Sequence, residues 1–187
     1  MTHRIMASVL TGIVAFILSL PSIAQPIPDK SLKVVIIRHG EKPETGDNLS
    51  CQGENRALQL PAVLHKKFNK PDYTYVPSLG LSESTKHARM LQTVTPFAIK
   101  YNLTVNSQFD EKDYSKVAAD VQKKTGTVLL VWEHSAIPHL AKKMGVKNLP
   151  VWQDNDFDSI WIITFVNGIA SLSVDNEGLK PSPDCSF

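Results

Sequence analysis

The tripeptide Arg38-His39-Gly40 stands at the end of an apolar, β-branched run, residues 34–37. Such a run predicts a buried strand, so the tripeptide is expected where that strand leaves its sheet. In open α/β sheets this edge is where ligands bind. Arginine offers a permanent positive fork that suits phosphate, and histidine offers a ring nitrogen that can be neutral near pH 7. The pattern therefore predicts a nucleophile for phosphorus beside a cation that holds phosphoryl oxygens.

A second histidine, His134, follows another apolar run, residues 128–132, with Glu133 between them. Two parallel strands would deliver both histidines to one edge of a sheet. Arg89 lies between the two motifs, early in an expected helix, where free N–H groups and the helix dipole favour anions. Two arginines, two histidines and a helix N-terminus together predict an oxyanion pocket.

The remaining patterns predict the elements that position these residues. Strands are expected over 33–38, 73–76, 103–105, 127–132, 159–166 and 169–174, and helices over 52–68, from Ser84 or Thr85 to 101, 113–124 and 136–144. Pro61 inside the first helix predicts a kink or a late start. Asn167-Gly168 between the last two strands is a hairpin signal. The expected fold class is α/β: a three-layer sandwich with a mostly parallel central sheet and a C-terminal hairpin.

With these residues in place, the chain resembles the histidine phosphatase superfamily, also called phosphoglycerate mutase-like, over nearly all of its length after residue 24. The matching residues, in the family's order and spacing, are Arg38-His39-Gly40-Glu41, Arg89 with Thr93 four residues on, and His134 after a late strand. The second motif departs from the Gly-His that is common in the family. It resembles a small exported branch that has Trp132-Glu133-His134 here and the acidic stretch Asp156-Phe157-Asp158.

The resemblance implies that His39 is the nucleophile that takes the phosphoryl group. It also implies that Arg38, Arg89 and His134 bind the phosphoryl oxygens and stabilise the transition state. The chemistry agrees, because the transferred group spreads negative charge over its oxygens and fixed positive donors stabilise it. The same cations would favour a neutral His39.

The proton donor for the leaving group has three candidates. Glu111 lies in the part of the chain where the family often has a glutamate, after its second arginine. Glu133 adjoins His134, but alternation along a strand would turn neighbouring side chains to opposite faces. Asp110 is the third candidate.

Three polar residues after the tripeptide are candidates for the pocket's mouth. Glu41 and Lys42 either line the mouth or are solvated loop charges. Asn48 could reach phosphate as an asparagine of the family does, although its offset from the tripeptide is longer than usual. Residues at the mouth would contribute to the choice of substrate.

We expect no metal and no other cofactor. Arginines supply the positive charge, and they would repel a cation held by the two histidines. Asp154, Asp156 and Asp158 are spaced like a metal loop but lack the glycine and distal glutamate of a calcium-binding loop, which favours a solvated acidic turn. Cys51 and Cys185 have no histidine spacing that suggests zinc. In an exported protein these cysteines would form one disulfide; two free thiols or a tail too mobile to pair are the alternatives.

Residues 1–24 have the pattern of a secretory signal peptide, with Arg4, an apolar stretch over 7–20 and small residues before Gln25. An uncleaved anchor is the alternative, but the apolar stretch is shorter than the ~20 residues that span a bilayer. We therefore expect one domain over 25–187 and a secreted or periplasmic protein, with no stable membrane span after cleavage. The formal net charge of +2 shows no basic excess for nucleic acid.

The leading hypothesis is an exported phosphatase that hydrolyses a phosphomonoester through a phosphohistidine on His39. Its partner would be a phosphorylated small molecule or phosphoprotein substrate, and no pattern specifies an oligomeric state. The short chain leaves few residues for an insert that caps the substrate, which favours an open site and hydrolysis. A phosphotransferase or mutase is the catalytic alternative, and a non-catalytic module that binds a phosphorylated ligand is the alternative from another class.

Overall fold

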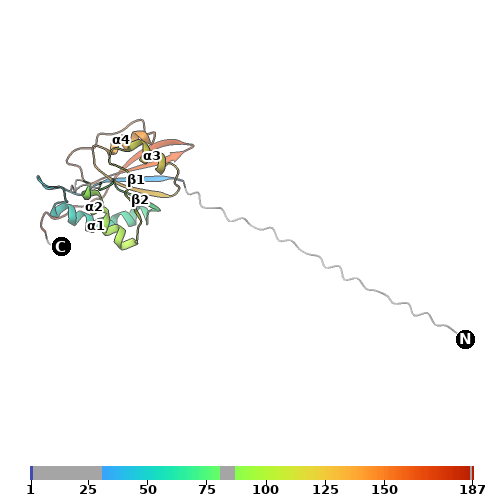
Figure 1. The fold of residues 1–187 in the computed structure, drawn as a ribbon, viewed down its shortest axis with the longest axis horizontal. Coiled ribbons are helices and arrows are strands. Elements are labelled where there is room, and N and C mark those ends of the chain that lie inside the picture. Colours follow the sequence, from blue (N-terminus) through green and yellow to red (C-terminus); the bar gives the residue numbers. More distant parts are fainter. Residues whose placement is uncertain (2–30, 81–86, 186) are drawn as a thin grey trace.

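The computed structural model describes residues 31–80, 87–185 and 187, together with Met1. Most of the expected signal peptide and the expected helix start at Ser84 or Thr85 lie outside these residues. The described elements alternate between strands and helices up to α4, and two consecutive strands follow (Figure 1). They are β1 (Lys33–Arg38), α1 (Cys51–Phe68), β2 (Tyr73–Tyr75), α2 (Ala88–Tyr101), β3 (Val105–Asn106), α3 (Tyr114–Val121), β4 (Thr127–Trp132), α4 (Ile137–Lys143), β5 (Ser159–Val166) and β6 (Ile169–Asn176).

The strands form one sheet in the order β3-β2-β4-β1-β5-β6. β4 pairs in parallel with both β1 and β2, and β2 pairs in parallel with β3. β5 runs antiparallel to β1 and makes a hairpin with β6. Asn167 and Gly168 both have positive φ, 51° and 76°, which is the backbone that an Asn-Gly hairpin turn requires.

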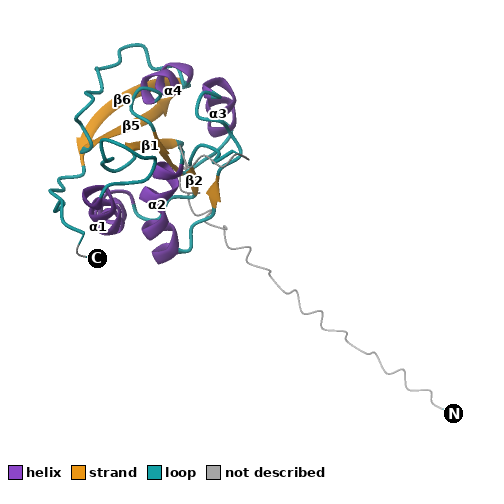
Figure 2. Ribbon diagram, turned by 60° about the vertical axis from the view of Figure 1, so that its left-hand side comes forward, coloured by secondary structure: helices purple, strands orange, loops and turns teal. Residues whose placement is uncertain are grey.

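Helices cover both faces of the sheet because side chains alternate along each strand. Val34 and Ile36 of β1 pack in the core that contains α3 and α4. Val35 and Ile37 pack in the opposite core, with α1 and α2. Figure 2 shows these two pairs of helices on opposite sides of the strands. The predicted three-layer sandwich with a mostly parallel sheet and a C-terminal hairpin is confirmed.

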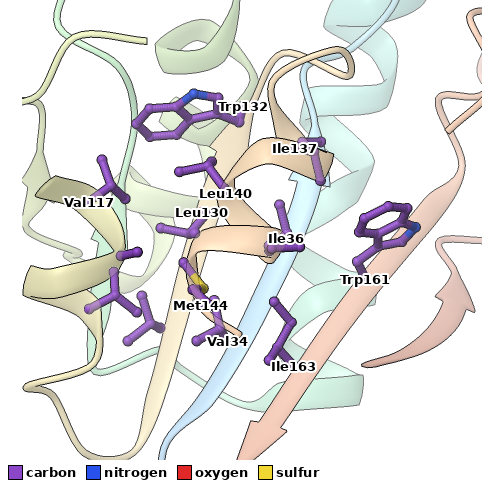
Figure 3. Close-up of a cluster of buried hydrophobic side chains, with 14 of the residues drawn as sticks. Val34, Ile36, Val117, Leu130, Trp132, Ile137, Leu140, Met144, Trp161 and Ile163 are labelled. Atoms are coloured by element: carbon purple, nitrogen blue, oxygen red, sulfur yellow. The ribbon is translucent and has the colours of Figure 1, made fainter. Parts of the chain in front are cut away.

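Trp132 ties the end of β4 to a loop that carries one of the candidate acids. The indole is fully buried in the same core as Ile137 and Leu140 of α4 (Figure 3). Its Nε1 donates a hydrogen bond of 2.9 Å to the carbonyl of Glu111. The loop before α3 is therefore held against the strand end that leads to His134.

Some element boundaries differ from the expected ones for local reasons. α1 begins at Cys51, well before Pro61, so the late start predicted as one of two possibilities is wrong. β3 begins at Val105 rather than at residue 103. Asn102 and Leu103 instead form the C-terminal cap of α2. Asn102 adopts a left-handed φ of 50°, and Leu103 N donates to Ala98 O at 2.9 Å.

The N-terminus of α1 packs closely against the loop after β1. Ser50 caps the helix, with its Oγ accepting from Gly53 N at 3.2 Å. A Cβ atom on Gly40 would lie 2.8 Å from Gly53 O, so this approach requires a residue without a side chain. The contact fixes the loop immediately after His39.

The first residue of α1 also holds the C-terminal tail. Cys51 forms a disulfide with Cys185, with their Cα atoms 4.9 Å apart. Asn55 Nδ2 donates to the carbonyls of Ser182 and Asp184, at 2.9 and 2.8 Å. The tail therefore lies along the start of α1. Within the described ranges, no helix is both long enough and apolar enough to cross a membrane.

Candidate active site

The two histidine-bearing strands end side by side. Arg38 is the register partner of Trp132 in the parallel pair β1 and β4. The pairing continues one residue past β1, because His39 N donates to Trp132 O at 3.0 Å. The residues that follow each strand, His39 and Glu133, therefore emerge at the same edge of the sheet, as expected for parallel neighbours.

Thr93 joins this edge to α2. Its Oγ1 accepts from Gly40 N at 2.9 Å and donates to Arg89 O at 2.7 Å. Thr93 is fully buried, and its bond with Gly40 N is shielded from water. One hydroxyl thus links the residue after His39 to the first turn of the helix that carries Arg89.

His39 is a buried, neutral imidazole. Its Nδ1 lies 2.7 Å from Gly40 O, and because a carbonyl only accepts, Nδ1 holds the proton. Nε2 is then left with a lone pair. Burial, together with the charges of Arg38 and Arg89, lowers the pKa of His39 to about 4, although the bond to Gly40 O acts in the opposite direction. The ring is therefore in the form that can attack phosphorus.

Arg38 is also buried, at 2% exposure, and is held on one side by the loop over 152–158, here called the 152–158 loop. Its Nη1 donates to the carbonyls of Asp154 and Asp156, at 2.6 and 3.0 Å. Its guanidinium carbon lies 3.8 Å from the centre of the Phe157 ring. Its buried Nε has no hydrogen-bond acceptor among the described residues.

Arg89, like Arg38, has a buried Nε without a hydrogen-bond partner among the described residues. Its Nη1 lies 3.5 Å from Gly46 O. Its charge acts on His39. A buried donor without a partner is costly, so two such guanidinium groups around one imidazole indicate a site built for an anion.

His134 lies between two carboxylates. Its Nδ1 contacts Glu133, and its Nε2 lies 3.0 Å from Asp154 Oδ1. When the ring carries both protons, Nε2 can donate to Asp154, whereas Nδ1 makes a charge contact with Glu133 without the geometry of a hydrogen bond. The sequence pattern predicts Asp154 only as part of a solvated acidic turn, because its contact with His134 depends on the path of the 152–158 loop.

Glu133 does not point away from the second histidine as strand alternation suggested. β4 ends at Trp132, so the alternation no longer applies one residue later. The Glu133 carboxylate accepts from Ser135 N at 2.8 Å and from the Ser135 hydroxyl. Burial would raise the pKa of Glu133, but these bonds and the charge of His134 hold it below its usual value. Glu133 is therefore ionised at neutral pH and has no proton to donate.

Glu111 is paired with a histidine. His87 Nε2 lies 3.3 Å from Glu111 Oε2, and His87 Nδ1 lies 2.9 Å from Ser78 O. Since Nδ1 must donate to the carbonyl, the proton between Nε2 and Glu111 can reside on either partner. This pair can hold a transferable proton. Asp110 is exposed, and its main chain contacts the N-cap of α3, Asp113.

The three mouth candidates separate in the structure. Glu41 is not a solvated loop charge, because it makes a bidentate pair with buried Arg56, at 2.7 to 3.1 Å. Lys42 is exposed. Asn48 Oδ1 accepts from Gln92 Nε2 at 2.8 Å, which ties the loop to α2.

Arg56 is the buried centre of a charged cluster that no sequence pattern predicts. Besides Glu41, it contacts Glu177 and lies 3.6 Å from Asp158. Burial raises the pKa of Glu177 to about 8, against the charge of Arg56. The cluster joins the loop after His39 to the 152–158 loop and to the segment after β6. Arg56 carried no signal of its own, since its partners are far away in the sequence.

The acidic turn expected at residues 154–158 is not solvated as a whole. The Asp156 carboxylate accepts from Asp158 N at 2.9 Å and from Ser159 N at 3.0 Å. Asp158 Oδ1 accepts from Leu179 N at 3.0 Å. Of the three aspartates, Asp154 alone is exposed, so the turn is a structural element beside Arg38. No cluster of three potential metal-ligating side chains occurs among the described residues.

Comparison with solved structures places this geometry in a known fold. The protein histidine phosphatase SixA, complexed with tungstate, matches with a TM-score of 0.59 and 16% identity, over 78% of this chain and 97% of that chain. The chain has the fold of the histidine phosphatases. The alpha-ribazole phosphatase from Shigella flexneri matches with a TM-score of 0.56 and 13% identity, over 77% and 96% of the two chains.

A third similar structure is the phosphoserine phosphatase from Entamoeba histolytica, a mutant in complex with phosphoserine. It matches with a TM-score of 0.54 and 13% identity, over 79% of this chain and 97% of that chain. No protein-family model and no curated protein matches the sequence. The likeness to histidine phosphatases therefore lies in the fold, and the chemistry must be argued from the site.

Proposed function

We propose that this chain is an exported phosphatase that hydrolyses a phosphomonoester through a phosphohistidine on His39. The observation that carries the proposal is a neutral, buried His39 between two arginines whose Nε donors have no acceptor in the described structure. A phosphoryl group supplies the acceptors that these donors lack, and it presents phosphorus to Nε2. The phosphatases among the similar structures support this class of activity.

In the first step, Nε2 of His39 attacks phosphorus, a P–N bond forms, and the P–O bond to the leaving group breaks. The leaving oxygen takes a proton from an acid, for which the Glu111–His87 pair is the proposed source. In the second step, water attacks phosphorus, the P–N bond breaks, and the water proton returns to that pair. Nδ1 keeps its proton throughout both steps and donates it in the hydrogen bond to Gly40 O.

Arg38, Arg89 and His134 are proposed to hold the phosphoryl oxygens during both steps. Charge on those oxygens is best stabilised by fixed donors, which need no rearrangement as the reaction proceeds. The substrate class is a phosphorylated small molecule or phosphoprotein. Hydrolysis is proposed over transfer because the described helices and strands all belong to the sheet and its two helix layers, which leaves none of them as a separate cap.

The mechanism is tested by trapping the intermediate. The full chain, reacted with a ³²P-labelled phosphomonoester and quenched in base, should retain label that acid releases, as expected for a P–N bond. His39→Ala should abolish both label and turnover, while His139→Ala, in an exposed histidine of α4, should leave both unchanged. Label that survives acid, or full turnover by His39→Ala, would refute a phosphohistidine on His39.

Export is proposed from the pattern over residues 1–24, and the disulfide supports it because such bonds persist in oxidising compartments. The mass of the protein recovered outside the cytoplasm tests the cleavage. We expect a chain that begins at Gln25. A recovered mass that includes residues 1–24 would contradict this part of the proposal.

A further inference from the structure

Phe157 contacts both residues that the proposed chemistry places at the phosphorus atom. Its ring centre lies 3.8 Å from the guanidinium carbon of Arg38. Its ring also meets the imidazole of His39 edge-on, with centroids 6.2 Å apart and planes at 60°. A guanidinium over an aromatic face is attracted by the ring's quadrupole, and an edge contact of this kind is a preferred aromatic geometry.

The residues on either side of Phe157 are firmly held. Trp152 Nε1 donates to Asp156 O at 3.0 Å. The Asp156 carboxylate also accepts from Ser159 Oγ at 2.5 Å, in addition to the backbone bonds described above. Asp158 is bonded to Leu179 N and lies beside Arg56. The backbone of Phe157 is therefore fixed before any ligand binds.

This anchoring determines how Arg38 is oriented. One face of the guanidinium rests on Phe157, and Nη1 is fixed by two carbonyls of the same loop. A planar group held by one face and one corner has little freedom to rotate. Its Nε, which has no acceptor in the described residues, is thereby held in a fixed direction.

We propose that Phe157 is a positioning residue for phosphate binding, which acts by holding the guanidinium of Arg38 with its Nε edge toward the phosphoryl group. The inference rests on the proposed function, since it assigns the anion to that edge. It does not make Phe157 a catalytic residue, because the ring offers no group to the reacting atoms. It does predict that an aromatic ring, rather than bulk alone, is required at this position.

The test compares Phe157→Leu with Phe157→Tyr, and uses orthovanadate as the binding probe. Leucine keeps apolar volume but removes the aromatic face, so we expect vanadate affinity to fall about tenfold, whereas tyrosine should stay within about threefold of the wild type. With p-nitrophenyl phosphate as substrate, Phe157→Leu should raise KM and lower kcat/KM, whereas Phe157→Tyr should stay close to the wild type in both. Phe165→Leu, a matched change in a partly buried phenylalanine of β5, should leave both measurements unchanged.

A double-mutant cycle separates positioning from general damage to the fold. If Phe157 acts through Arg38, then adding Phe157→Leu to Arg38→Ala should cost no further vanadate affinity. An equal tenfold loss in both backgrounds would overturn the inference. The Arg38 Nε–H signal in NMR gives a readout that needs no ligand, and it should be rigid in the wild type and Phe157→Tyr but averaged in Phe157→Leu.

The two proposals can fail separately. If the wild type binds no vanadate, but its rigid Arg38 Nε–H signal becomes averaged in Phe157→Leu, the proposed function is refuted while the contact that holds Arg38 stands. A wild type that binds vanadate, with Phe157→Leu unchanged in affinity and in the NMR signal, would refute the role of Phe157 alone. Melting temperatures of all variants exclude unfolding as the cause.

Discussion

Asp154 Oδ1 lies 3.0 Å from His134 Nε2, so a carboxylate of the protein contacts the histidine that is proposed to bind a phosphoryl oxygen. The Asp154 side chain is otherwise almost completely exposed, at 97%. An exposed ion pair of this kind is weak, so an incoming anion can displace it at little cost. We infer that the phosphoryl group and Asp154 compete for His134.

Asp154→Asn should therefore bind vanadate more tightly, by about two- to fivefold, because the competitor loses its charge. Isothermal titration at pH 7 measures the change. Asn155→Ala, in the exposed neighbour of the same loop, is the matched control and should have no effect. Weaker binding by Asp154→Asn would mean that Asp154 helps His134 to hold the anion instead.

The proton donor can be assigned by varying the leaving group. If the Glu111–His87 pair supplies the proton, Glu111→Gln should lower kcat by about 10²- to 10⁴-fold for alkyl phosphates, whose leaving oxygen needs a proton. The loss should be much smaller for p-nitrophenyl phosphate, whose leaving group departs as a stable anion. Glu133→Gln should show no such dependence, since Glu133 is ionised. The reverse pattern would assign the acid to Glu133.

The protonation state of His39 gives a prediction for acidic pH. Its pKa is lowered to about 4, so NMR titration should place its midpoint near pH 4. Arg89→Gln should move the midpoint upward, because it removes a cation that disfavours the charged ring. A midpoint near the ordinary histidine value in the wild type would contradict the neutral, buried state.

The same shift has a consequence for stability. Unfolded His39 takes up a proton as the pH falls below about 6.5, whereas folded His39 does so only near pH 4. The unfolded state therefore binds more protons in this window, and this histidine makes the free energy of unfolding fall as the pH is lowered through it.

Thr93→Val tests the link between the sheet edge and α2. Valine keeps the shape of the side chain but leaves the Gly40 N–H without its acceptor, so the free energy of unfolding should fall by about 1–3 kcal/mol. Turnover should fall as well, because the hydroxyl joins the segment of His39 to that of Arg89. Thr93→Ser keeps both hydrogen bonds and should restore turnover. Denaturant titration and kcat measure the two effects.

Glu177 should make the protein less stable as the pH rises through neutrality. Its pKa is raised to about 8 by burial, so the folded chain keeps a proton that the unfolded chain loses above about 4.5. Stability from this group is complete below that value and is lost progressively up to pH 8. Glu177→Gln cannot titrate, so its free energy of unfolding should change less between pH 5 and 8. Glu44→Gln, in the exposed loop after β1, is the control, and equal slopes in all three proteins would refute the shift.

The sequence predicted the parts of this protein that follow from local patterns. Because side chains alternate along the strand before Arg38, its residues divide between the two cores on opposite faces of the sheet. The parallel pairing of this strand with the one before Glu133 places His39 and Glu133 at one edge of the sheet. The pairing of Arg56 with Glu177 joins residues separated by 121 positions, so no local pattern contains it. The contact between Asp154 and His134 likewise depends on the path of an irregular loop, which composition alone does not specify.

The disulfide between Cys51 and Cys185 closes residues 51–185 into a covalent ring. Five strands of the sheet, Arg89 and His134 lie inside this ring, whereas β1, Arg38 and His39 lie outside it. β1 is nevertheless a central strand, inserted between β4 and β5. A single cut in the exposed loop between Gly40 and Cys51 would thus give two molecules: a linear peptide with Arg38 and His39, and a circular remainder with Arg89 and His134.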